Sequence, residues 1–129
     1  MALGNARLDA VLSGTDLNRM VKFYTEVLGL KKVEVAMPQG HAFVEAGEGS
    51  GLVLYQRSEP PKAENTACEF EVDSVEQTVA DLQAKGVKFE EYDFPGLKTV
   101  NGVAQMGPYK GAWFKDTEGN IISIGSRVR

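Results

Sequence analysis

The chain shows two hydrophobic periodicities, one typical of strands and one typical of helices. Residues 7–13 alternate apolar and polar side chains, which predicts a strand with one buried face. Apolar residues then recur at helical spacing over residues 17–28, between a capping residue, Asp16, and a helix-ending glycine, Gly29. The pattern that follows predicts three more strands, at residues 30–37, 41–46 and 52–56.

The same order of elements returns in the second half of the chain. Residues 67–73 alternate again, and a helical stripe follows from Val75 to Leu82, behind a capping box formed by Ser74 and Gln77. The remaining segments are predicted as a linker at 58–65, strands at 87–92, 111–115 and 121–125, and an irregular lid or binding loop at 93–109.

The repeated order predicts an α+β fold made of two βαβββ modules, at residues 7–57 and 66–127. Its clearest piece is residues 112–124, which form a strand, a tight turn and a strand, and residues 41–54 are a weaker copy of it. Pairing two such modules predicts a curved mixed sheet with helices outside and a concave cavity, where a ligand can bind.

Composition narrows the class of protein. A chain of 129 residues with 43% hydrophobic residues suits one compact domain or two half-domains. A net charge of −4 with interleaved signs gives no reason to bind nucleic acid or an anionic membrane. No apolar run is long enough to span a bilayer, and no secretion signal is recognised. Cys68 is the only cysteine and cannot form an internal disulfide, so we expect a cytoplasmic location.

Three acidic residues lie on the less apolar side of the strands that open the modules. If that side lines the cavity, Asp9, Glu69 and Glu71 could bind a cationic ligand, or one of them could act as a base. The alternative is that they lie in solvent, which we favour for Glu71.

For several other residues, a role in ligand binding or catalysis is compared with a purely structural role. Trp113, Met106 and Tyr109 suit a ligand wall and suit core packing equally well. His41 is the only histidine, and a polar residue starting a strand is favoured over a base at the cavity rim. For Cys68, a buried structural thiol is favoured over a nucleophile.

Several motifs together resemble one family. Residues 23–30 read FYTEVLGL, residues 70–76 read FEVDSVE, and residues 114–120 read FKDTEGN. With Asp16-Leu17, these stretches resemble the glyoxalase / bleomycin-resistance / extradiol dioxygenase group, the vicinal oxygen chelate superfamily. The resemblance runs from about Leu8 to Ile124 and implies paired βαβββ modules.

The resemblance also implies where a metal would bind. In the family's enzymes a divalent ion in the cavity takes ligands from the first and last strands of each module, usually His, Gln or Glu. The matching positions here are Asp9, Leu54 (or, one residue earlier, Val53), Ala67 and Ser123. Leucine and alanine offer no donor atom, and a tight site needs three or more donors. We therefore expect no metal and no cofactor.

We therefore expect a glyoxalase/bleomycin-resistance-like protein that binds a small molecule in its cavity. The expected lining is Asp9, Leu54, Ala67, Glu69, Met106, Tyr109, Trp113 and Ser123. The alternative is an enzyme of the family, a lyase, isomerase or dioxygenase, with a non-standard or metal-free site that uses Asp9 or Glu69 as base. The resemblance also implies a homodimer, which the unpaired edges of each sheet favour.

Overall fold

The computed structural model describes residues 2–126. The chain divides into two compact units, unit 1 up to Pro60 and unit 2 from Pro61 onward. The division falls inside the predicted linker at residues 58–65. Among the described residues, no helix has the length and apolar character needed to cross a membrane.

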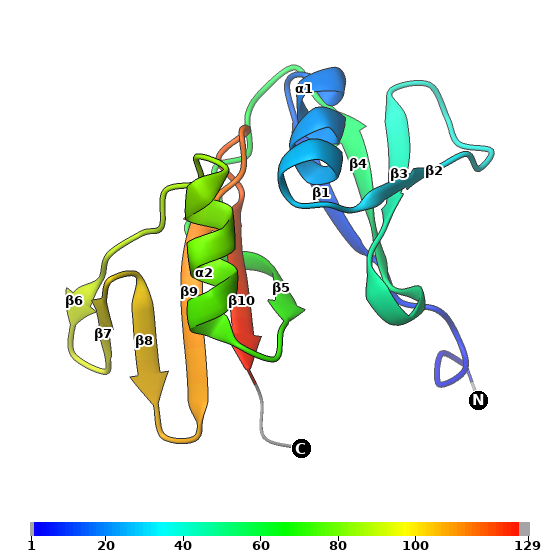
Figure 1. Ribbon diagram of the computed structural model, residues 1–129. Coiled ribbons are helices and arrows are strands. Elements are labelled where there is room, and N and C mark those ends of the chain that lie inside the picture. Colours follow the sequence, from blue (N-terminus) through cyan, green and yellow to red (C-terminus); the bar gives the residue numbers. More distant parts are fainter. Residues whose placement is uncertain (1, 127–129) are drawn as a thin grey trace. The chain divides into compact units, whose positions relative to one another are not determined.

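Unit 1 is a four-stranded mixed sheet with one short helix (Figure 1). Its elements are β1 (Ala10–Gly14), α1 (Leu17–Lys22), a π-helical turn (Phe23–Val27), β2 (Lys31–Val33), β3 (His41–Glu45), a 3₁₀ turn (Gly47–Gly49) and β4 (Gly51–Gln56). The strand order is β1-β4-β3-β2, with β1 parallel to β4 and the other pairs antiparallel.

The core of unit 1 lies between its helix and one face of its sheet. Asp16 caps α1 as predicted, because its side chain accepts a hydrogen bond from the backbone N–H of Arg19 at 3.0 Å. Met20 and Tyr24 are fully buried, and α1 packs against β3 and β4. The predicted first strand starts later than expected, at Ala10, and Leu8 is 91% exposed.

Unit 2 repeats this plan with a wider sheet (Figure 1). Its elements are β5 (Thr66–Glu71), α2 (Val75–Ala84), β6 (Asp93–Phe94), β7 (Leu97–Val100), β8 (Val103–Met106), β9 (Tyr109–Lys115) and β10 (Ile121–Ser126). The strand order is β5-β10-β9-β8-β7-β6, with β5 parallel to β10. The first four strands of this order match the order β1-β4-β3-β2 of unit 1, and the predicted α+β fold is confirmed.

The turns between the last two strands of each unit are also copies. In unit 1 the backbone N–H of Ala46 donates to the carbonyl of Ser50 at 2.8 Å, and in unit 2 the N–H of Asp116 donates to the carbonyl of Asn120 at 3.0 Å. Gly119 adopts φ +94° inside the second turn. The resemblance between residues 41–54 and 112–124 seen in the sequence therefore extends to the hydrogen bonds that close the turns.

The segment predicted as an irregular loop at residues 93–109 is in fact mostly sheet. Asn101 and Gly102 have φ values of +52° and +82° and join β7 to β8 in a two-residue hairpin between Val100 and Val103. The carboxylate of Glu91 accepts a hydrogen bond from the N–H of Gly102 at 3.0 Å, which fixes this turn. Prolines and glycines in the segment mark hairpin turns, and the prediction of a loop was wrong.

The prediction of a strand at residues 87–92 was also wrong. That segment makes one isolated bridge, between Phe89 and Phe114, and a hydrogen bond from the N–H of Glu90 to the carbonyl of Trp113 at 2.8 Å. All of β8 pairs with β9, on the side of β9 away from β10. The place beside β9 is therefore taken by β8, which follows β6 and β7 in the sequence, and not by residues 87–92.

Candidate functional site

The register of the sheet in unit 2 places five predicted lining residues on one face. Ser123 of β10 pairs with Glu69 on one side and with Trp113 on the other, and Met106 of β8 pairs with Tyr109. Residues paired across strands share a face, as do residues two apart along a strand. We call this surface the Glu69 face, which includes Glu69, Glu71, Met106, Tyr109, Gly111, Trp113, Ser123 and Gly125. Glu71 is exposed there, as the sequence favoured.

Glu69 is the polar centre of the Glu69 face. The hydroxyl of Tyr109 donates a hydrogen bond to Oε1 of Glu69, and the hydroxyl of Ser123 donates to the same oxygen at 3.0 Å. Ser123 itself is only 2% exposed, so its hydroxyl lies beneath the carboxylate. The two hydroxyls hold the half-buried Glu69 side chain in one position, because hydrogen bonds to a charged acceptor are among the stronger ones.

Two glycines make room for this contact. A Cβ atom added at Gly125 would lie 2.6 Å from the hydroxyl of Tyr109 and 2.9 Å from Oε1 of Glu69. A Cβ atom added at Gly111 would lie 2.8 Å from the ring of Tyr109. Real Cβ atoms essentially never approach this closely, so the tyrosine reaches Glu69 only because both strand positions lack a side chain.

Trp113 adds an aromatic surface beside Glu69. Its indole Nε1–H donates to the hydroxyl of Thr66 at 3.2 Å, and its ring meets the ring of Tyr92 edge to face with 5.7 Å between centroids. The residue is half-buried, and the register places it on the Glu69 face. A carboxylate on β5 and an aromatic side chain on β9 thus lie on one face of the sheet, with β10 between them.

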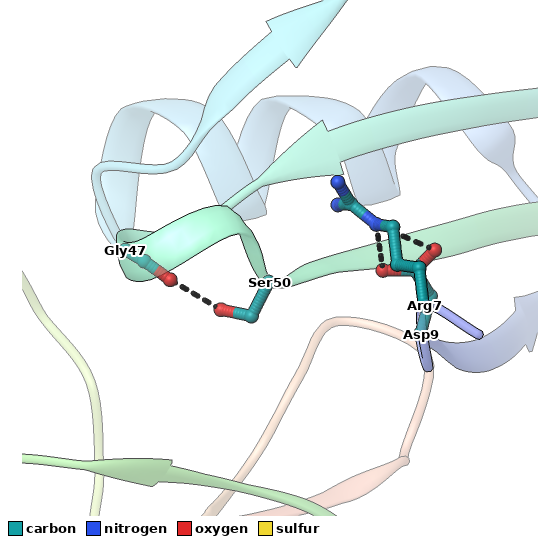
Figure 2. A network of polar contacts seen from close by, with 4 residues as sticks. All are labelled: Arg7, Asp9, Gly47 and Ser50. Atoms are coloured by element: carbon teal, nitrogen blue, oxygen red, sulfur yellow. Dashed lines mark hydrogen bonds and ion pairs between the residues drawn. The ribbon is translucent and has the colours of Figure 1, made fainter. Parts of the chain in front are cut away.

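Asp9 belongs to unit 1 and has a different environment (Figure 2). Nε of Arg7 lies 2.9 Å from one oxygen of Asp9 and 3.1 Å from the other. The same guanidinium stands 5.0 Å from the centre of the Phe43 ring. Figure 2 also draws the hydrogen bond from the hydroxyl of Ser50 to the carbonyl of Gly47, in the turn that precedes β4. Arg7 engages both oxygens of Asp9, so Glu69 is the better supported of the two candidate bases.

The other predicted site residues lie elsewhere. Leu54 is fully buried in the core of unit 1, while Val53 occupies the opposite face of β4. Leu54 therefore has no surface to offer a ligand. Ala67 is exposed and lies at an irregularity in the pairing of β5 with β10. The ring of His41 stacks on that of Tyr55 with 5.6 Å between centroids.

Cys68 lies on the other side of β5 from Glu69, paired with buried Ile122. Burial, with a smaller contribution from Asp116, raises the pKa of its thiol from 9.0 to about 11. At pH 8 the folded thiol should react with DTNB about a hundred times more slowly than the thiol of urea-unfolded protein, because a pKa two units higher leaves about a hundredth of the thiolate. Equal rates would contradict a buried structural thiol.

The residues at the family's metal positions do not fit a divalent ion. Leu54 and Ala67 carry no donor atom, and the hydroxyl of Ser123 is bonded to Glu69. Among residues 2–126, no three His, Cys, Asp or Glu side chains are grouped closely enough to hold a metal ion.

Several residues of the face were not found from the sequence. Gly111 and Gly125 are glycines inside strands, a signal that usually marks close backbone or ligand approach and that could have identified them. Thr66 and Tyr92 support Trp113 from β5 and from the segment before β6. No local pattern indicates those two contacts.

Two units of the βαβββ type, one of them with a polar and aromatic sheet face, define an α+β protein of the paired-module class. The chain belongs to the Glyoxalase/Bleomycin resistance protein/Dioxygenase superfamily, whose model matches residues 7–124. A comparison with functionally curated proteins found no significant match.

Solved structures with the same fold have different described functions. An integron cassette protein from the mobile metagenome of V. Cholerae is 25% identical, with a TM-score of 0.63 and 98% of both chains covered. The antibiotic binding protein TnmS3 from Streptomyces sp. CB03234 is 20% identical, with a TM-score of 0.64, 96% of this chain and 98% of that chain covered. Lactoylglutathione lyase from Agrobacterium tumefaciens is 20% identical, with a TM-score of 0.66, 96% of this chain and 95% of that chain covered. At these identities the likeness shows the fold alone.

Proposed function

We propose that this protein binds a small organic cation with an aromatic ring on the Glu69 face. The observation that carries the proposal is the contact of Glu69 with the hydroxyls of Tyr109 and Ser123, beside the indole of Trp113. The carboxylate attracts a positive charge, and the indole face attracts both an aromatic ring and a cation. Binding by TnmS3, described as an antibiotic binding protein, supports small-molecule binding within this fold.

The site is also organised before a ligand arrives. The two hydroxyls that donate to Oε1 restrict the Glu69 side chain, and Thr66 restricts the indole of Trp113. Side chains that are already ordered lose little entropy on binding, so more of the contact energy contributes to affinity. This order is consistent with a preformed binding site.

The first test compares two dyes with one ring system. Proflavine carries a positive charge at pH 7.5, whereas acridine is neutral there. We expect calorimetry to show saturable binding of proflavine at one site and an affinity for acridine at least tenfold lower, because only proflavine gains from the carboxylate. Equal affinity for the two dyes, or no binding of proflavine, would contradict the proposal.

The alternative is an enzyme in which Glu69 acts as a general base. Its support is the contact between a half-buried carboxylate and two hydroxyls, which is also a geometry suited to proton transfer. We propose that no divalent metal is resident, because the matched positions lack donors. Stoichiometric zinc, nickel, manganese or iron in the purified protein would favour a metalloenzyme over this proposal.

We further expect a cytoplasmic homodimer. The end strands of each sheet, β1 and β2 in unit 1 and β5 and β6 in unit 2, pair on one side only within their own unit. Such edges favour association with a second chain. Light scattering at micromolar concentration should give twice the mass of the chain, and a monomer would contradict the expectation.

A further inference from the structure

The sheet of unit 2 is wider than the helix that covers it. Figure 1 shows α2 against β9 and β10, with β8, β7 and β6 extending to one side. Along β7 and β8, Val100 pairs with Val103, and Val103 pairs with buried Ala112 beneath the helix. Val103 and Val100 therefore share the helix side of the sheet, and Val100 is 63% exposed there.

This arrangement creates a groove between α2 and the β7–β8 hairpin. Its volume is about 550 Å³, which is within the range of small-molecule sites. The groove, which we call the α2 groove, has an apolar floor with charged side chains around it. The floor consists of Val79, Ala80, Val100 and Val103, and the charged residues are Glu76, Lys98 and Lys110.

Two lysines and one glutamate line the α2 groove, in a chain whose net charge is −4. Nζ of Lys110 lies 2.7 Å from a carboxylate oxygen of Glu76, so these two charges compensate each other. Among the described residues Lys98 forms no ion pair, and its cross-strand neighbour on β6 is Asp93. An apolar floor beside an ammonium group that is not held in an ion pair is complementary to a molecule with an apolar body and one negative charge.

We propose that the α2 groove is a second binding site, which takes an amphiphilic organic anion such as an aliphatic or aromatic carboxylate or sulfonate. The site goes beyond the proposed function, because it lies on the helix side of the sheet and selects the opposite charge. Lys98 contacts the anionic group, and Val100 and Val103 contact the apolar body.

The test uses the fluorescent anion 8-anilinonaphthalene-1-sulfonate with the full chain. We expect saturable binding that shifts the backbone amide resonances of residues 79–83 and 98–105 in a ¹H–¹⁵N spectrum. Lys98→Gln should weaken binding roughly five- to tenfold, because it removes the attracting charge from an exposed position. Lys85→Gln, at the end of α2 and outside the groove, removes the same charge and should leave the affinity unchanged.

A second variant tests the apolar floor. Val100→Asp should weaken binding more than tenfold, because it replaces an exposed apolar contact with a repelling charge. Glu69→Gln should not change the affinity for the anion, so failure of the proposed function would leave this result intact. Unchanged affinity in Lys98→Gln, or resonance shifts confined to β5 and β10, would overturn the proposal.

Discussion

Replacing Asp116 by alanine is expected to lower the free energy of unfolding by about 3 kcal/mol, or the midpoint of thermal unfolding by roughly 10 °C. The carboxylate is 6% exposed and accepts hydrogen bonds at 2.9 Å from the backbone N–H groups of Glu118 and Asn120 and from the side-chain amide of Asn120. Removing it takes away the oxygen atoms that accept these three buried hydrogen bonds. Circular dichroism during heating measures the effect.

Two variants make this result specific. Asp116→Asn keeps one oxygen as an acceptor and should lose about half as much stability. Asp81→Ala removes an exposed aspartate from α2 and should change the free energy of unfolding by no more than about 0.5 kcal/mol. A loss in Asp116→Ala as small as that of Asp81→Ala would show that the turn does not depend on the carboxylate.

The second large effect is expected on ligand affinity. Glu69→Gln should weaken proflavine binding at least tenfold, because it removes a half-buried negative charge and keeps the shape of the side chain. The amide oxygen of glutamine can still accept from Tyr109 and Ser123, so the fold should be retained. Calorimetry with proflavine measures the change.

The matched control is Glu76→Gln. Glu76 is exposed on α2, on the other side of the sheet, and its removal changes the net charge by the same amount. The affinity of the Glu76→Gln variant for proflavine should equal that of the unmodified chain. Similar losses in both variants would indicate a nonspecific effect of net charge and would contradict a role for Glu69.

Local chemistry made much of the fold predictable. The caps at Asp16 and Ser74 are observed, because short polar side chains satisfy backbone N–H groups at a helix start wherever they occur. The turn at residues 116–120 combines a carboxylate with a glycine at positive φ, so its conformation depends on neighbouring residues alone. Alternation along β5 correctly separated Glu69 from Cys68.

Other predictions failed for physical reasons that can be identified. The Asn101-Gly102 pair between two valines is a strong hairpin signal, but the nearby Pro95-Gly96 and Gly107-Pro108 led to an irregular loop being predicted. Leu54 was predicted to line the cavity, with Val53 as the alternative one residue earlier. Successive side chains of a strand lie on opposite faces, and Leu54 lies on the buried face of β4.

The contact at the centre of the candidate site is not encoded locally. Tyr109 and Glu69 are 40 residues apart, and Ser123 and Glu69 are 54 apart. Alternation can assign each of these residues to one side of its strand, but only the pairing of β5, β10 and β9 brings them together. The sequence therefore indicated the residue types of the site without their arrangement.

The measurement that tests binding at the Glu69 face most directly uses the only tryptophan of the chain, Trp113. Its indole N–H, which is bonded to Thr66, gives a single cross-peak in a ¹H–¹⁵N spectrum. On titration with proflavine we predict that this cross-peak shifts and saturates with the affinity found by calorimetry. A cross-peak that stays in place while calorimetry reports binding would contradict the proposal, because the ligand would then be bound elsewhere.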